Sequence, residues 1–220
     1  MITIDIIQNE EIIPLAICNL PDNQVCVAAL NNNGQWIRPC PVYQTDIVEG
    51  ALFNYLQKTI LLLKPLTDSN KRLEDRAFFR DSIRVEKMKQ EWVHAHILKY
   101  LDQSVEDVFE RGRSAGIVCP IVKDLTYKRG LGGKKNIRIS FEDGIGKLHN
   151  FIVVENRFKT RILEEVDFDD NLEEEVRLQF LRELQNDDVY FTITLMTKNS
   201  TTFPGPYDGC HPLISGIHHF

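Results

Sequence analysis

Two residues near the start of the chain have side chains that can bind nucleic acid. Trp36 and Arg38 alternate within residues 35–42, a stretch typical of a strand, so both side chains lie on one face. An exposed indole can stack on a base, and a guanidinium beside it can bind a phosphate or a base edge. The alternative is structural: Trp36 packs between the two barrels into which the chain is expected to fold, and Arg38 pairs with an internal carboxylate.

A basic, glycine-containing loop at residues 127–135 is the second candidate contact. Its glycines allow backbone N–H groups to approach an anion, and its basic side chains supply positive charge. The loop is not a Walker A motif, because the GxxxxGK[ST] spacing is absent. The alternative is a solvated hairpin loop without a ligand. The loop and the strand after it supply five predicted nucleic-acid contacts, which are Lys128, Arg129, Lys134, Lys135 and Arg138.

The charge of the chain is unevenly distributed, although its total of -6 is only mildly acidic. Residues 123–138 carry six bases and one acid, a balance of +5, whereas residues 162–190 carry eleven acids and two bases, a balance of -9. A local positive field attracts a polyanion even when the total charge is negative. Alternatively, the acidic segment neutralises the basic one within the fold or across a dimer.

No sequence pattern indicates a catalytic or metal centre. HExxH, GxSxG and the Rossmann fingerprint are absent, and no group of Cys and His has a standard zinc spacing. A nucleophile pair such as Cys40 or Cys119 with His149 can be drawn, but no motif fixes it. We therefore expect no cofactor, no metal ligand and no catalytic residue, and a function that is not enzymatic.

The composition is that of a globular protein of 220 residues, of which 43% are hydrophobic. It excludes collagen, coiled coils and disulfide-rich mini-proteins. No apolar run approaches the roughly 20 residues of a membrane span, and the chain start lacks the features of a signal peptide. Five scattered cysteines without CxxC spacing favour reduced thiols and a cytoplasmic location.

Short apolar runs separated by Pro, Gly and Asn turns predict strands in both halves of the chain. The expected strands are residues 11–18, 24–30, 35–42, 59–64, 116–125, 135–142, 148–155, 189–196 and 212–219. Two helices, a long one and a short one that starts with a capping box at Ser104, are expected within about residues 82–111. An acidic amphipathic helix is expected at about 171–184.

This order of elements favours small barrels over a βαβ sheet. We predict a mostly β fold with α insertions, that is, an α+β protein with two tandem OB-like β-barrels and a helical insert. The first barrel and its helical insert are expected to span residues 1–113. The second barrel, which includes the acidic helix, is expected to span residues 114–220.

A recognisable pattern runs through residues 13–29, 34–39, 73–75, 190–196 and 213–217. One strand leads into a cysteine-containing strand, a turn and the element Trp-Ile-Arg-Pro, and two further strands close the chain. The pattern resembles the bacterial dual OB-containing domain family, although Lys71-Arg72 stands where that family has other polar residues. The resemblance implies two OB-like barrels in tandem and a nucleic-acid-binding or nucleotide-binding role.

These observations favour a non-catalytic cytoplasmic module that binds single-stranded nucleic acid or a nucleotide through Trp36, Arg38 and the basic loop. No membrane contact is expected. A second hypothesis is a protein-interaction or regulatory subunit of a bacterial defence or stress system. Its partner surface is then the acidic segment at 162–190, used with another protein or in a homodimer.

Overall fold

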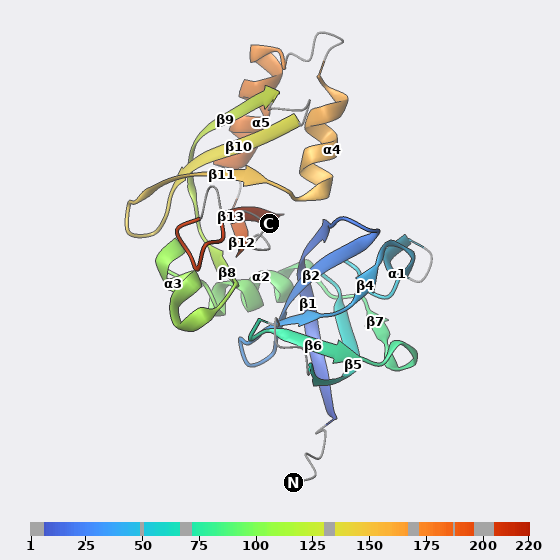
Figure 1. Ribbon diagram of the computed structural model, residues 1–220. Coiled ribbons are helices and arrows are strands. Elements are labelled where there is room, and N and C mark those ends of the chain that lie inside the picture. The colour runs from blue at the N-terminus through green and yellow to red at the C-terminus, as the bar shows by residue number, and fades with distance from the viewer. Residues whose placement is uncertain are drawn as a thin grey trace. The chain divides into compact units, whose positions relative to one another are not determined.

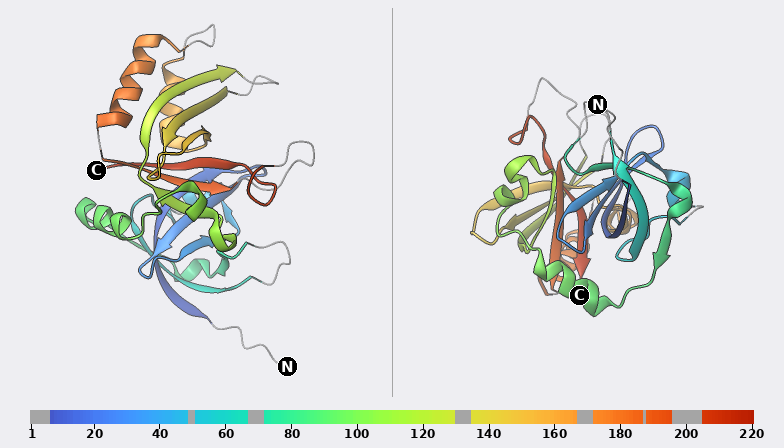
Figure 2. Two further views of the ribbon diagram at one scale, coloured as in Figure 1. Left: turned by 90° about the vertical axis from the view of Figure 1, so that its left-hand side faces the viewer. Right: turned by 90° about the horizontal axis from the view of Figure 1, so that it is seen from below.

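The computed structural model describes residues 7–48, 51–66, 72–129, 135–166, 172–186, 188–195 and 205–220. The chain forms two compact units, which Figure 1 and the two views of Figure 2 show as ribbons. The first unit holds the residues up to Tyr100 and Arg111–Ser114, and the second holds Leu101–Glu110 and Ala115–Phe220. Strands dominate both units, which confirms the predicted mostly β fold with helices.

Five strands of the first unit form a closed barrel. β1 (Gln8–Asn19) pairs through its second half with β2 (Gln24–Asn31) and through its first half with β5 (Lys58–Pro65). β2 also pairs with β3 (Trp36–Pro39), and β6 (Asp75–Phe78) lies between β3 and β5. Every pair is antiparallel except β3–β6, which is parallel. The order round the barrel is therefore β1, β2, β3, β6, β5 and back to β1.

The interior of this barrel is filled by apolar side chains, most of which alternate along the strands. They are Ile12, Val25, Val27, Ala29, Ile37, Val42, Phe53, Leu61 and Leu63. Two short elements come after β3, namely β4 (Val42–Tyr43) and α1 (Gln44–Val48). The sheet continues beyond β5 into β7 (Arg84–Glu86).

The prediction of helix from residue 82 is wrong at its beginning. A 3₁₀ turn, η1 (Arg80–Ser82), and then strand β7 occupy this part of the chain, because residues 84–86 pair with β5 and extend the sheet. Helix α2 begins only afterwards and spans Gln90–Lys99. Sheet pairing thus overrides the local helical spacing of apolar residues.

The second, shorter helix is confirmed. α3 (Val105–Phe109) starts with the predicted capping box, in which the Ser104 hydroxyl accepts from the Asp107 N–H at 3.1 Å and the Asp107 carboxylate accepts from the Ser104 N–H at 2.9 Å. A 3₁₀ turn, η2 (Glu110–Gly112), comes directly after it. A side chain at Gly116 would meet Val108 at 2.7 Å, so glycine allows α3 to pack closely on the strand that contains Gly116.

The second unit has a first strand divided in two. β8 (Ala115–Val118) and β9 (Ile121–Arg129) are separated only by Cys119-Pro120. β9 forms an antiparallel pair with β10 (Lys135–Glu142), which forms the predicted hairpin with β11 (Leu148–Val153). Proline has no N–H to donate, so the ladder is interrupted where the strand divides.

The remaining strands of this unit complete a ring. β11 pairs in parallel with β13 (Pro212–His219), β13 pairs with β12 (Val189–Leu195), and β12 pairs with β8. Because β8 and β9 are consecutive, the chain itself joins the two ends of this ring at Cys119-Pro120. The second unit is therefore also a five-stranded barrel when β8 and β9 are counted as one bent strand.

Numbered in chain order, the strands of both barrels have the order 1-2-3-5-4 and return to 1, and the pair 3–5 is parallel in each. Both barrels also place helical structure between strands 3 and 4. A five-stranded Greek-key barrel of this kind is an OB-like fold. The prediction of two tandem OB-like barrels is therefore confirmed.

Helices α4 (Asn156–Glu164) and α5 (Glu174–Asn186) lie alongside β9, β10 and β11 (Figure 1). α4 contributes Phe158 and Ile162 to the core of the second barrel, and α5 contributes Phe180, Leu181 and Leu184. α5 falls close to the range predicted for the acidic helix. In the described part of the chain, no helix is long and apolar enough to cross a membrane.

Candidate functional site

Alternation along β9, β10 and β11 gives this part of the second barrel two different faces. Leu125, Ile137 and Ile139 point into the core that α4 and α5 cover. The residues between them point away from this core, and most are polar or basic. The apolar Ile152, which pairs with Arg138, and the acidic Glu142 also lie on this side. We call the remaining polar and basic residues the outer face, and they are Thr126, Lys128, Asn136, Arg138, Ser140 and Asn150.

Two of the predicted nucleic-acid contacts, Lys128 and Arg138, lie on the outer face. Lys128 is exposed, and its cross-strand partner is Asn136. Arg138 donates through Nη2 to the carbonyl oxygen of Asn150 at 2.6 Å and through Nε to the Asn150 side chain. Asn150 in turn donates to Ser140 Oγ at 2.6 Å. This network fixes the guanidinium at the protein surface.

The other predicted contacts of the basic loop are described only in part. The backbones of Arg129 and Lys135 are cross-strand partners and so close the hairpin at the base of the loop. Lys134 and the glycines of the loop lie outside the described residues. A role for the loop in binding therefore stays a prediction.

The turn before Trp36 in the first barrel is determined directly by its sequence. The Asn31 side chain accepts hydrogen bonds from the N–H groups of Asn33 at 3.0 Å and Gln35 at 2.9 Å. Gly34 has φ +77°, and a side chain there would lie 2.4 Å from the Tyr100 ring. Only glycine satisfies both the backbone angle and the close contact, so the Asn-Gly turn predicted from the sequence sets the start of β3.

Trp36 is buried, and Arg38 is paired with an internal carboxylate as its structural alternative expected. The Trp36 side chain is only 6% exposed, so no open ring face is presented to solvent. Arg38 Nε lies 3.1 Å from Asp75 Oδ1, and its Nη1 donates to Ser114 Oγ at 3.4 Å. Direct ligand contacts by these two residues stay predictions. Because Trp36 is buried, it can contact a ligand only through the part of its ring that faces a cavity.

The cavity next to Trp36 has a volume of about 330 Å³ and is also lined by Leu73, Arg76 and Arg113. A second cavity of about 480 Å³ shares Leu73 and Arg76 with it and adds Arg72. Leu73 is 64% exposed despite its apolar side chain. The two cavities together offer apolar surface beside guanidinium groups, and the carboxylates of Glu10 and Glu74 also line the first cavity.

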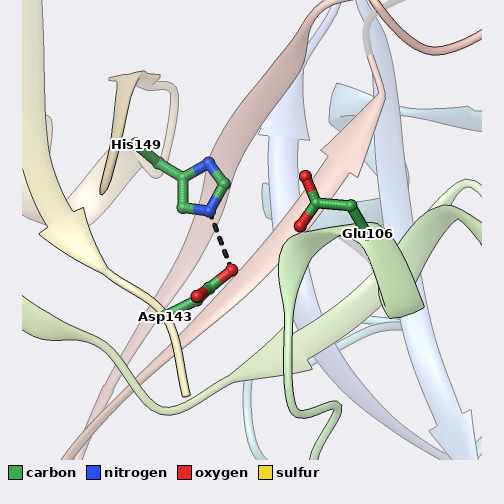
Figure 3. Close-up of side chains that lie close together, drawn as sticks. All are labelled: Glu106, Asp143 and His149. Carbon is green, nitrogen blue, oxygen red and sulfur yellow. Dashed lines mark hydrogen bonds and ion pairs between the residues drawn. The ribbon is translucent and has the colours of Figure 1, made fainter. Parts of the chain in front are cut away.

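A polar cluster that the sequence did not predict lies in the second unit (Figure 3). It consists of Glu106 from α3, Asp143 from the turn after β10, and His149 from β11, and one ligand atom of each lies within 4.8 Å of the others. Asp143 is 1% exposed, and its Oδ2 lies 2.8 Å from His149 Nε2. The residues are far apart in sequence, so no motif spacing signals the cluster.

Asp143 organises the local structure through several hydrogen bonds. Its Oδ1 accepts from the N–H groups of Ile145 at 3.2 Å and Lys147 at 3.0 Å, and its Oδ2 accepts from the Val105 N–H at 3.2 Å. Burial alone raises the pKa of Asp143, but the hydrogen bonds from His149 and these N–H groups outweigh burial and lower it. The carboxylate therefore stays ionised and connects α3 to the turn.

Glu106 is held by two donors. Its Oε1 accepts from Lys147 Nζ and from the Tyr207 hydroxyl, the latter at 3.3 Å. Partial burial raises the pKa of Glu106, but the hydrogen bond and positive charge of Lys147 lower it overall. Burial and the nearby Glu106 raise the pKa of Tyr207 to about 12, so its hydroxyl remains a donor at neutral pH.

The thiols do not have the properties of nucleophiles. Burial raises the pKa of Cys40 to about 11, with a further contribution from Asp75. Partial burial and Asp188 also raise the pKa of Cys119. A raised pKa keeps a thiol protonated and unreactive at neutral pH. The Cys–His pairs considered from the sequence thus lack a thiolate, and the His149 ring is engaged by Asp143 instead.

Comparisons with known proteins give little further information. No protein-family model and no curated protein matches the chain. Among solved structures, one match is a chain in the structure of a replication protein A heterotrimer bound to single-stranded DNA, with 7% sequence identity and a TM-score of 0.37. The match covers 86% of this chain but only 43% of that chain. A similarity at this level carries no argument about function.

Proposed function

We propose that this protein binds single-stranded nucleic acid through the outer face of its second barrel. The observation that carries the proposal is the position of Lys128 and Arg138 in an OB-like topology. OB barrels bind oligonucleotides on strands 2 and 3 and on the loops beside them. In the second barrel, strands 2 and 3 are β10 and β11, and the basic loop joins strands 1 and 2.

The chemistry of the outer face fits a polyanion. Lys128 and Arg138 supply positive charge, while Asn136, Ser140 and Asn150 offer neutral hydrogen-bonding groups in adjacent strands. Contacts of this kind are made mainly to phosphates, so they give affinity but little sequence specificity. An extended face of three strands suits several consecutive nucleotides better than one free nucleotide.

The basic loop extends this surface in the proposal. Lys134 and Lys135 contribute additional phosphate contacts, and Arg129 stands at the base of the loop. The resemblance to the bacterial dual OB-containing domain family agrees with such a role in a cytoplasmic protein. In the first barrel, Trp36 and Arg38 contribute indirectly, since they shape β3 beside the cavities that Arg76 lines.

Fluorescence anisotropy with labelled single-stranded DNA and RNA tests the proposal. We expect binding at low salt that weakens steeply as salt is raised, because each phosphate contact releases a counterion. Lys128→Ala combined with Arg138→Ala is expected to weaken binding about tenfold or more. The slope of log affinity against log salt concentration is expected to fall by the amount that about two phosphate contacts contribute. The matched control is Lys159→Ala, which removes a charge from α4 and leaves the outer face intact.

No binding at low salt, or equal binding by the double variant and the control, contradicts the proposal. A further variant, Lys134→Ala with Lys135→Ala, tests the loop separately. If only the loop variant weakens binding, the site is the loop rather than the strands of the outer face.

A second candidate function rests on α5. Its acidic residues Glu174 and Glu175 are exposed. Leu178, one turn further along the same helix, is 39% exposed. An apolar side chain within an acidic helical surface suits a basic protein partner or a second copy of the chain. Light scattering after size-exclusion chromatography distinguishes the two functions: a salt-sensitive oligomer without affinity for nucleic acid favours this one.

A further inference from the structure

The cluster of Glu106, Asp143 and His149 has a composition that the nucleic-acid proposal does not use. It combines one imidazole with two carboxylates, and the three side chains point toward one another from α3, from the turn after β10 and from β11 (Figure 3). Imidazole and carboxylate groups together are common ligands of divalent first-row transition metals.

Each carboxylate has one oxygen that is occupied by donors and one that belongs to the cluster. Asp143 Oδ1 accepts two backbone N–H groups, and Glu106 Oε1 accepts from Lys147 and Tyr207. These donors fix the carboxylates in the way that outer-sphere hydrogen bonds orient metal ligands. Of the other two oxygens, Asp143 Oδ2 faces His149 and also accepts from the Val105 N–H at 3.2 Å, whereas Glu106 Oε2 accepts from no donor in the described residues.

Glu106 Oε2 is the unusual atom of this cluster. This atom is buried, although the Glu106 side chain as a whole is 38% exposed, and it has no hydrogen-bond partner within the described part of the chain. A buried carboxylate oxygen without a partner is unfavourable, and a bound cation is one of the groups that satisfies such an atom. The observation is independent of the composition of the cluster and also indicates a ligand.

We propose that Glu106 Oε2, Asp143 Oδ2 and His149 Nε2 bind one divalent transition-metal ion of the Zn²⁺ or Mn²⁺ class. The 2.8 Å between Asp143 Oδ2 and His149 Nε2 is a hydrogen-bond distance, and it widens to roughly 3.3 Å when both atoms bind one tetrahedral ion with metal–ligand bonds of about 2.0 Å. The ion replaces the proton between these two atoms. The imidazole proton then resides on Nδ1, and Glu106 reaches the ion by rotation of its side chain.

Binding of this ion connects three segments of the second barrel. α3, the turn after β10, and β11 each contribute one ligand, so an ion that binds only the folded state stabilises their arrangement. The same turn leads from β10 into β11, which carry most of the outer face. The inference does not rest on nucleic-acid binding, because its ligands lie outside the outer face.

Isothermal titration of the full chain with Zn²⁺ alone, and separately with Mn²⁺ alone, tests this inference. Every protein carries Cys119→Ser, so that this exposed thiol cannot contribute to zinc binding. We expect one equivalent of metal and a loss of affinity of at least about tenfold in Glu106→Gln. The matched control, Glu110→Gln, removes the same charge from an exposed residue after α3 and is expected to bind as before.

Imidazole ¹⁵N resonances provide a readout that does not depend on affinity. We expect the Nε2 resonance of His149 to shift on metal addition in the parent protein and in Glu110→Gln. Thermal unfolding without metal establishes that Glu106→Gln is folded, and His149→Gln serves as a second ligand variant. The inference is overturned if no metal binds at millimolar concentration, or if Glu106→Gln binds as tightly as Glu110→Gln.

Discussion

The two barrels share one strand order but close it in different ways. In the first barrel, β1 is continuous and pairs with both β2 and β5, with a bulge between Pro14 and Ala16. In the second, the same strand is divided at Cys119-Pro120 into β8 and β9. A proline thus stands where strand 1 passes from one partner to the next in both barrels. The shared topology tolerates either a bulge or a full break at this position.

The barrels also differ in the helices that come after strand 3. α1 in the first barrel is a single short turn of helix, whereas α4 and α5 in the second add five aromatic and aliphatic side chains to the core. The second barrel therefore has a larger core and an outer face backed by helices. The first barrel instead offers cavities beside β3 and β6. A common topology thus presents a basic strand surface in one barrel and surface cavities in the other.

The two barrels are expected to differ most strongly in how their stability responds to acid. The residue responsible is His218 in β13. This side chain is 1% exposed, and its Nε2 lies 2.8 Å from Thr192 Oγ1. Burial, assisted by the charge of Arg157, lowers its pKa from 6.5 to about 3. The unfolded chain therefore binds a proton that the folded chain does not, and stability falls as pH drops from about 6.5 toward 3.

Between pH 7 and pH 4.5 this residue is expected to account for a loss of about 2–3 kcal/mol in the free energy of unfolding. The expected signature is a flatter pH dependence in His218→Gln than in the parent protein, measured by urea unfolding. The control is His211→Gln, an exposed residue in the same unit. Equal pH dependence in His218→Gln and the parent would show that this histidine is not held neutral.

Asp46 makes the first barrel respond to acid in a different range. Arg80 donates to both oxygens of its carboxylate, from Nε to Oδ1 at 3.0 Å and from Nη2 to Oδ2 at 3.0 Å. These hydrogen bonds lower the pKa of Asp46 below 3.8, although burial opposes the change. Its contribution is therefore present above about pH 4 and is lost only as pH falls further. The first barrel is thus expected to retain this interaction at pH values where His218 already destabilises the second.

The smaller prediction concerns how each barrel starts its helix after strand 3. Glu155 precedes α4 and accepts from the Phe158 N–H at 2.6 Å, whereas Asp46 inside α1 accepts from the Tyr43 N–H at 2.8 Å. These are the two opposite halves of a capping box. Glu155→Ala is expected to cost about 1 kcal/mol, with faster hydrogen exchange in α4 and unchanged exchange in α1.

Asp46→Ala is the matched variant for the first barrel. It is expected to increase exchange around α1 and to leave α4 unchanged, with a cost of about 1 kcal/mol from the cap and a further loss from the Arg80 pair. If either variant changed hydrogen exchange equally in α1 and α4, the result would contradict the view that each cap stabilises its own barrel.

The sequence was most informative where local patterns also decide the tertiary structure. Apolar runs bounded by turns predicted β1, β2, β5, β10, β11, β12 and β13, and the Ser104 capping box predicted α3. β6 and β7 were missed because they are short and are defined by their pairing with β5 rather than by apolar alternation. α4 was missed because only Phe158 and Ile162 form its apolar stripe.

The candidate sites show the same limit. The side of β10 on which Arg138 lies could be predicted from alternation, whereas Lys128 was expected in a loop and lies in β9. The binding role of both residues stays a prediction. The burial of Trp36 could not, since the same Trp-Ile-Arg-Pro element fits an exposed or a packed indole. The cluster of Glu106, Asp143 and His149 depends on a contact between α3 and the β10–β11 turn, which no spacing in the sequence encodes.

The most direct test of the central claim is an amide NMR titration with a short single-stranded oligonucleotide at low salt. The largest changes in amide chemical shift are expected on the outer face, at Lys128, Arg138 and Asn150. Raising the salt concentration is expected to reverse these changes. The contrary result is a set of changes confined to the cavity residues of the first barrel, such as Leu73 and Arg76, or no changes at low salt.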